Sequence, residues 1–440
     1  MHTSISKWVR LALAILLGSL AVGPLAPVQS AKSAGSGPAT GVVCTTGPNF
    51  SLTAQAGYIQ MSDMNTVYMW SYGVTGGSFQ YPGPVLCVSE GDTVTITLQN
   101  NLPYNLPTSL VFPGQEDVQA GGVPSQPEFD TGGNLTSLTK SAANGGSVTY
   151  SFVASRPGTF IYESGTDTKT QVPMGLASVL IVRPSMGANF LYNRASDQFT
   201  PEEEFMAFLS EVDPYQHAAW EKSVGKGRNY NLNSYRARYW LINGRGFPDD
   251  MADNYASWLP SQPYGALARI HPFNDTVASS DPAYHPYPAV ERFVNVGTEE
   301  YPFHPHGQNG QVVGRDGYPL AGPNGEDMAF ENFLVNLGPG QTWDVLFAWH
   351  DAEAYDPVSN PVDVTIPDLV NMTIGMFYSG SPYLGVQETM PPGTSTLNQC
   401  GEYYIISHNH ALFQLDAFGQ TLAGPITYLR IDPPLPNNCP

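Results

Sequence analysis

Short runs of alternating apolar and polar residues, closed by glycine and proline, restrict the fold of this chain more than any other feature. In YPGPVLCVSEGDTVTITLQNNLP, residues 81–103, Val94, Ile96 and Leu98 alternate with polar neighbours after a Glu-Gly-Asp turn. A period of two is that of a half-buried β-strand. The chain has 44 glycines and 39 prolines, and only 13% of its residues are charged. This composition favours short strands joined by many turns, so we predict an all-β protein.

The N-terminus has the three parts of an export signal. Lys7 and Arg10 precede the apolar stretch LALAILLGSLAVG, and small residues near Ser30 or Ala31 offer a cleavage site. The apolar stretch is short for a membrane span, and no later stretch is long and apolar enough to form one. We therefore predict a signal peptide at residues 1–31 and a secreted protein, extracellular or periplasmic, without membrane insertion.

The cysteines and the net charge fit an exported protein. The four cysteines allow three pairings, of which we favour Cys44–Cys87 and Cys400–Cys439; a pairing between the two halves of the chain stays open. The formal charge of -20 argues against nucleic acid as a partner.

The chain repeats one order of features in two halves. Each half has an apolar strand, a Gly-rich turn, a tight Pro-Gly turn and a Gly-aromatic strand, the last being GTFIYESG in the first half and GEYYIISHNH in the second. This repetition predicts two β-sandwiches of similar build, over residues 41–185 and 200–440. The second half carries long insertions rich in Pro, Asp, Asn and Ser, which we predict to be surface loops. They cover roughly residues 213–235, 249–287 and 351–397.

Two His-x-His pairs are the residues best suited to chemistry. Four of the nine histidines are His304 and His306 in YPFHPHG, and His408 and His410 in SHNHA. Residues two apart on a strand point to the same face, so each pair can present two imidazoles to one metal ion. Copper and zinc both accept imidazole ligands. The alternative, which the pattern leaves open, is that these are hydrogen-bonded polar residues at strand ends that bind nothing.

Several motifs resemble, in the same order, the landmarks of the multicopper oxidases. They are YPGPVLCVSEGDTVTITLQNNLP, GTFIYESGTDTKTQVPMGLASVLIVRP, YWLINGRGFPD, YPFHPHGQNGQVVGRDG, LGPGQTWDVLF and GEYYIISHNH. The resemblance spans nearly the whole mature chain and is closest to the short, laccase- and nitrite-reductase-like form with two cupredoxin domains. It implies two Greek-key cupredoxin-like β-sandwiches, the second with long loop insertions.

The same resemblance implies that the first domain has lost its copper ligands. Where the family has His-x-His-Gly after a first-domain strand, this chain has Val111 and Pro113 in SLVFPGQ. Where the family has a second His-x-His, this chain has Glu163 and Gly165. Every cluster histidine of the first domain is therefore replaced.

The blue copper centre of the family also lacks its counterparts here. Asn409 stands where the family has the ligating cysteine, and Tyr301 and Gln414 stand at its histidine positions, with Gly419 near the axial position. An amide cannot supply the thiolate on which a blue copper site depends. Since electrons enter the family's copper cluster through that cysteine, the resemblance implies that the usual electron route is absent.

These replacements leave one candidate site and two readings of it. His304, His306, His408 and His410, with Glu163 facing them, would hold a single divalent ion at a domain or subunit boundary. Copper is the expected ion, with zinc or another divalent ion as the alternative, and the resemblance implies a homotrimer. The protein would then have at most weak oxidoreductase activity on a small-molecule substrate that the sequence does not indicate. The alternative is a metal-free binding or scaffold protein that keeps the fold, with its contact surface on the insertions.

Overall fold

Strands dominate the computed structural model, and the prediction of an all-β fold is confirmed. The signal peptide expected at residues 1–31 and the Cys400–Cys439 pair lie outside the residues that the structure describes. From Gly35 onward the chain groups as a single compact unit. The described residues are 38–223, 230–307, 309–350, 370–371, 377–378, 403–432 and 434–437.

Two facing sheets are built from strands between Cys44 and Arg183. The four-stranded sheet has the order β1 (Cys44–Thr46), β4 (Val85–Ser89), β12 (Ala177–Arg183) and β11 (Gly158–Glu163). The six-stranded sheet has the order β3 (Thr66–Val74), β2 (Asn49–Gln60), β5 (Thr93–Asn100), β10 (Ser147–Val153), β6 (Gln119–Ala120) and β7 (Val123–Pro124). A two-stranded ribbon, β8 (Glu128–Phe129) with β9 (Leu135–Ser137), accompanies them. The predicted disulfide Cys44–Cys87 is confirmed and joins β1 to β4.

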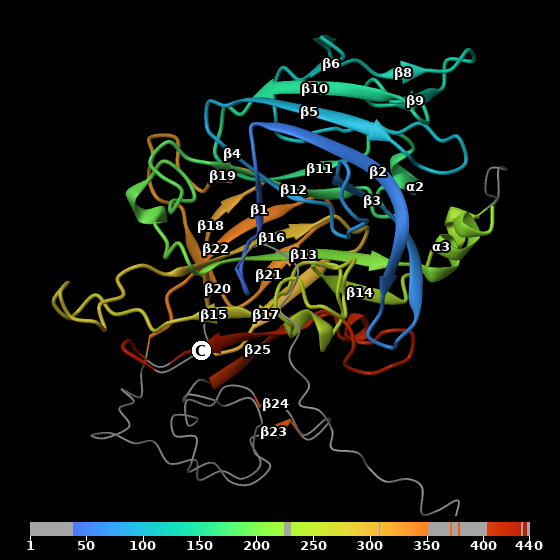
Figure 1. Ribbon diagram of the computed structural model, residues 1–440. Helices are drawn as coiled ribbons and strands as arrows, with labels where there is room; N and C mark the ends of the chain where they lie inside the picture. The colour runs from blue at the N-terminus through green and yellow to red at the C-terminus, as the bar shows by residue number, and fades with distance from the viewer. Residues whose placement is uncertain are drawn as a thin grey trace, which may run out of the picture. The chain divides into compact units, whose positions relative to one another are not determined.

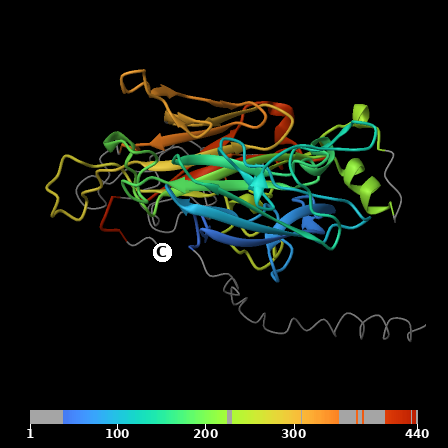
Figure 2. The ribbon, with the colours of Figure 1, turned by 90° about the horizontal axis from the view of Figure 1, so that it is seen from above.

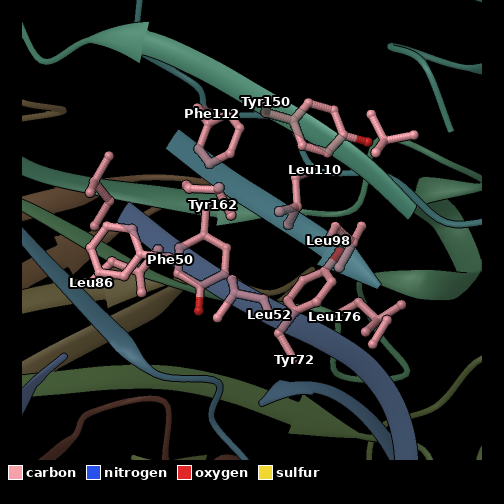
Figure 3. Close-up of a cluster of buried hydrophobic side chains, with 14 of the residues drawn as sticks. Phe50, Leu52, Tyr72, Leu86, Leu98, Leu110, Phe112, Tyr150, Tyr162 and Leu176 are labelled. Atoms are coloured by element: carbon pink, nitrogen blue, oxygen red, sulfur yellow. The ribbon is translucent and has the colours of Figure 1, made fainter. Parts of the chain in front are cut away.

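The core between these two sheets follows from the alternation in the sequence. Val94, Ile96 and Leu98 on β5 are fully buried, while the threonines between them reach the surface in part. Side chains of both sheets meet in this core, as Figure 3 shows for Phe50, Leu52, Tyr72, Leu86, Leu98, Leu110, Phe112, Tyr150, Tyr162 and Leu176.

A second pair of sheets is built from strands between Glu204 and Ile431. The larger sheet has the order β14 (Tyr239–Ile242), β13 (Glu204–Val212), β16 (Ala289–Asn295), β22 (Thr342–Phe347), β18 (Gly310–Arg315) and β19 (Tyr318–Pro319), with β20 (Phe330–Asn332) also on β18. The smaller sheet has the order β15 (Ala268–Ile270), β26 (Ile426–Ile431), β25 (Tyr403–Asn409), β17 (Tyr301–Pro305) and β21 (Val335–Leu337). A separate ribbon pairs β23 (Val370–Asn371) with β24 (Phe377–Tyr378). The four main sheets follow one another as layers from β10 to β25 (Figure 1).

Both apolar contacts and buried charge join the first pair of sheets to the second. Ile181 of β12 packs in one cluster with Phe208 of β13 and Val294 of β16. Beside this cluster Arg183 of β12 contacts Glu204 of β13 at 2.5 Å. Glu204 also contacts the Arg292 guanidinium at 2.6 Å, and the Arg292 side chain is 1% exposed. The charges at this boundary are therefore paired rather than hydrated.

The prediction of a surface loop over 213–235 is wrong for its first part, which forms helix α3 (Pro214–Glu221). Asp213 caps the helix by accepting hydrogen bonds from the backbone N–H groups of Tyr215 and Gln216. His217 and Trp220 are buried, because the helix packs on β3 of the first sheet pair. Figures 1 and 2 both show α3 beside the N-terminal strands. No helix in the described ranges is long and apolar enough to cross a bilayer.

Candidate metal-binding site

The two His-x-His pairs lie side by side on neighbouring strands. β17 and β25 run antiparallel, and His304 stands directly opposite His408. The ring centroids are 4.7 Å apart for His304 and His306, 5.1 Å for His306 and His408, and 5.5 Å for His408 and His410. The His304 and His410 rings are 5.4 Å apart. Strand pairing thus gathers four imidazoles on one face of the smaller sheet.

Backbone carbonyls determine the tautomers of two of these rings. His304 Nδ1 lies 2.6 Å from the Phe333 carbonyl oxygen, and His408 Nδ1 lies 2.9 Å from that of Asn409. A carbonyl oxygen only accepts, so each Nδ1 carries the proton and donates it, and each Nε2 keeps its lone pair. Metal-binding histidines usually have such an outer partner on the second nitrogen.

His306 and His408 face each other through their Nε2 atoms, which are 3.1 Å apart. Two nitrogens at this separation can share a proton, and they can also bind one ion at about 2.0–2.1 Å each. Burial, and then the charge of neighbouring histidines, lowers the pKa of His306 to about 4. Burial also lowers the pKa of His408, against the Asn409 carbonyl, which raises it. Both rings are therefore neutral at pH 7, the form that binds metal.

The ring positions stop short of a complete coordination sphere. Over the part of the chain that the structure describes, no three His, Cys, Asp or Glu side chains are arranged to hold a metal ion. The histidines fit copper in their chemistry, and His304 and His408 each keep an unprotonated Nε2.

Glu163 is not part of this cluster within a single chain. It ends β11, where its backbone pairs with that of Val111. No hydrogen bond or ion pair among the described residues joins its carboxylate to any of the four histidines. Burial raises its pKa above the ordinary value.

Packing has closed position 165, one of the first-domain positions where the resemblance places a histidine. A Cβ atom on Gly165 would lie 2.6 Å from Val111 Cγ1, 3.1 Å from Ser109 Oγ and 3.3 Å from Leu138 Cβ. The first distance is shorter than any normal carbon contact, so the Val111 side chain fills the space that a residue-165 side chain would need. Position 165 therefore has no space for a ligand side chain. Pro113 is exposed.

The side chains at two positions that the family resemblance assigns to the blue copper ligands form hydrogen bonds with each other and with Glu299. The Asn409 amide donates from Nδ2 to Gln414 Oε1, and Gln414 Nε2 donates to Glu299 Oε2 at 2.7 Å. Asn409 is fully buried, and its Oδ1 has no hydrogen-bond partner. Gln414 Nε2 also lies 3.3 Å from the Glu300 carbonyl oxygen, next to the start of β17.

Tyr301, the third position that the resemblance assigns to this centre, has a different hydrogen-bond partner. Its hydroxyl donates to Glu211 Oε2 at 2.7 Å, and both side chains are buried. Burial raises the pKa of Tyr301 well above its ordinary value, and the Glu211 carboxylate adds to the rise. The motif reading did not anticipate Glu211 or Glu299, because both lie outside the ligand motifs. Gly419, near the predicted axial position, is an exposed turn residue with φ of +91°.

Comparison with known proteins agrees with the motifs. Residues 59–187 match the family model described as multicopper oxidase. The multicopper oxidase mgLAC is similar in structure, with a TM-score of 0.55, 20% identity, and coverage of 87% of this chain and 86% of that one. The blue copper oxidase from Nitrosomonas europaea has a TM-score of 0.56 and 18% identity, with coverage of 88% of this chain and 85% of that one. Fet3p, a multicopper oxidase that functions in iron import, has a TM-score of 0.50 and 16% identity, with coverage of 87% of this chain and 52% of that one.

No curated protein matches the chain in sequence. The identities to the solved structures are low, so these structures establish the fold alone. The chain therefore has the multicopper oxidase fold of two cupredoxin-like sandwiches. The match of residues 59–187 confirms the family resemblance of the motifs in that part of the chain.

Proposed function

We propose that this is an exported multicopper-oxidase-like protein that binds one copper ion through His304, His306, His408 and His410. The observation that supports the proposal is the convergence of four imidazoles, two of which have Nε2 left available by carbonyl partners on Nδ1. Nothing comparable remains at the first-domain positions.

A bound copper ion would supply one-electron redox chemistry. The chain's own residues limit that chemistry. Asn409 and Gln414 form a neutral amide pair at the place where a thiolate would bring in electrons. We therefore propose at most weak oxidoreductase activity, without the laccase cycle of the family.

Copper titration tests the site directly. We expect one equivalent of Cu(II) to bind per chain, and His304→Ala and His408→Ala each to weaken binding by about 100-fold or more, since each removes a ligand. Isothermal titration calorimetry gives the affinities, and electron paramagnetic resonance reports the ligand nitrogens. His350→Ala is the matched control, because this exposed histidine lies outside the cluster, and it should leave both measurements unchanged.

The same samples test the loss of the blue centre. The copper-loaded protein should lack the intense visible absorption of a copper–thiolate bond and should oxidise phenols only slowly. Absence of saturable copper uptake, or uptake that His408→Ala leaves intact, would contradict the proposed site. Fast phenol oxidation would contradict the loss of the electron route. Zinc run in competition shows whether the site prefers copper.

A metal-free scaffold is the second candidate function, and one observation favours it. The described residues contain no ready-made coordination sphere, and a hydrogen bond between His306 and His408 can satisfy both rings without an ion. Metal analysis of the protein as isolated separates the two functions, because a scaffold would contain no stoichiometric copper.

We also propose that three copies associate, so that Glu163 of one copy reaches the histidines of another. In a single chain Glu163 has no contact with them, while Leu412 and Phe413, next to His410, are 64% and 63% exposed. Sedimentation velocity should give a species of three times the chain mass, and Phe413→Asp should shift it toward monomer. A wild-type monomer at micromolar concentration would rule out this part of the proposal and leave the copper site testable.

A further inference from the structure

A cavity separate from the histidine cluster lies in the first sheet pair. It has a volume of about 470 Å³, within the range of small-molecule sites. Its walls come from five separate places in the chain: Trp70 on β3, Leu106 with Pro107, the residues from Leu135 to Leu138, the segment from Gly165 through helix α2 (Thr168–Gln171), and Trp220 on α3. None of the proposed copper ligands lines it.

One side of the cavity is apolar. Leu135 and Leu138 are 53% and 48% exposed although both are large aliphatic residues, and Leu106 adds to the same wall. Trp220 packs edge-on against the buried Trp70, with ring centroids 5.1 Å apart. Exposed leucines beside a cavity of this size offer burial to an apolar group of comparable size.

The polar residues deeper in the cavity hydrogen-bond to one another. Ser137 and Thr166 share a hydrogen bond of 2.9 Å between their hydroxyls. Gln171 accepts from Thr108 at 2.8 Å and donates to the Pro107 carbonyl at 2.8 Å. These bonds satisfy the polar groups of the wall, so a charged ligand would interact with Asp167 and Lys169, both of which are exposed.

Two opposite charges line the cavity and are not paired with each other. Asp167 and Lys169 have no side-chain hydrogen bond or ion pair to any residue that the structure describes, and Asp167 does not cap α2. Asp167 is held in the left-handed region, at φ 40° and ψ 56°.

We propose that this cavity binds an apolar α-amino acid in its zwitterionic form. The side chain would lie against the leucines and Trp220, the ammonium group near Asp167 and the carboxylate near Lys169. A ligand with only a carboxylate would place a negative charge near Asp167. A ligand with only an ammonium group would place a positive charge near Lys169. Only a ligand with both charges beside an apolar body complements all three features.

A set of three ligands and matched variants tests each part of this assignment. L-Phenylalanine should bind with a dissociation constant of about 0.1–1 mM. 3-Phenylpropionate, which lacks the ammonium group, and 2-phenylethylamine, which lacks the carboxylate, should each bind about tenfold more weakly. Isothermal titration calorimetry on the full mature protein measures all three.

The variants assign each charge to its partner. Asp167→Asn should remove the preference for phenylalanine over phenylpropionate. Lys169→Gln should remove the preference for phenylalanine over phenylethylamine. Leu138→Asp should weaken all three ligands, and because Leu138 is half exposed this variant should keep the near-ultraviolet circular dichroism of the wild type. His408→Ala should change none of the three, which separates this site from the copper site.

Three results would overturn the proposal. One is no saturable binding of L-phenylalanine at concentrations up to about 10 mM. Another is a truncated ligand that binds wild type as tightly as phenylalanine, which would assign the cavity to simple acids or amines. The last is phenylalanine binding that the folded Leu138→Asp variant leaves unchanged, which would place the ligand elsewhere.

Discussion

Arg292→Met is expected to lower the free energy of unfolding by about 3–5 kcal/mol, because it leaves buried carboxylates without their cation. Glu204 is held by Arg292 at 2.6 Å and by Arg183 at 2.5 Å, and Asp344 lies 3.4 Å from Arg292. Burial raises the pKa of Glu204, but the two arginines outweigh it and hold that pKa below its ordinary value. Guanidinium-induced unfolding followed by tryptophan fluorescence measures the loss.

An exposed arginine provides the control for this experiment. Arg236 is exposed, and its side chain has no hydrogen bond or ion pair to a described residue. Arg236→Met should therefore change stability by no more than about 0.5 kcal/mol. Equal effects of the two substitutions would show that the network at Arg292 contributes little. Glu204 and Arg292 lie where the second pair of sheets meets the first, so their loss would weaken the contact between the two pairs.

Glu291→Gln is expected to stabilise the protein at alkaline pH by about 5 kcal/mol and to have little effect at pH 4–5. The Glu291 side chain lies on β16 between Ala289 and Phe293, whose side chains point into the apolar core of the second sheet pair. One carboxyl oxygen has no hydrogen-bond partner, and burial raises the pKa of the group to about 8.

The sign of this pH dependence follows from proton binding. Between the ordinary pKa near 4.5 and the folded value of about 8, the folded protein keeps a proton that the unfolded chain has released. Stability therefore falls as pH rises through this window and levels off above it. Urea unfolding of both proteins from pH 5 to 9 measures the difference, with Glu116→Gln as the control, since Glu116 is 72% exposed. A constant difference across this range would contradict the assignment.

Local pattern was enough for the elements of the fold and for half of the site. The alternation of Val94, Ile96 and Leu98 predicts a strand with one buried face, since side chains two apart on an extended backbone point the same way. The same rule puts His304 beside His306, and His408 beside His410. The disulfide Cys44–Cys87 was one of the two predicted pairings, and it lies where β1 pairs with β4.

Long-range register decided how these parts combine. His306 and His408 are 102 residues apart, and they face each other because β17 and β25 pair with His304 opposite His408. A shift of one residue would have sent one pair into the core. Nothing in the neighbouring sequence encodes that choice. The prediction that Glu163 faces the histidines depends on such distant placement, and the single chain shows no contact between them.

The sequence by itself determined that the chain is all-β and that two His-x-His pairs each present one face. These are properties of residue identity and of periods along the chain. Only the tertiary structure decided that the four imidazoles meet, that Val111 closes the space beside Gly165, and that α3 packs on β3 and completes a cavity at Trp220. Each of these depends on pairing and packing between residues far apart in the chain, and the energy of those contacts is not written in any local pattern.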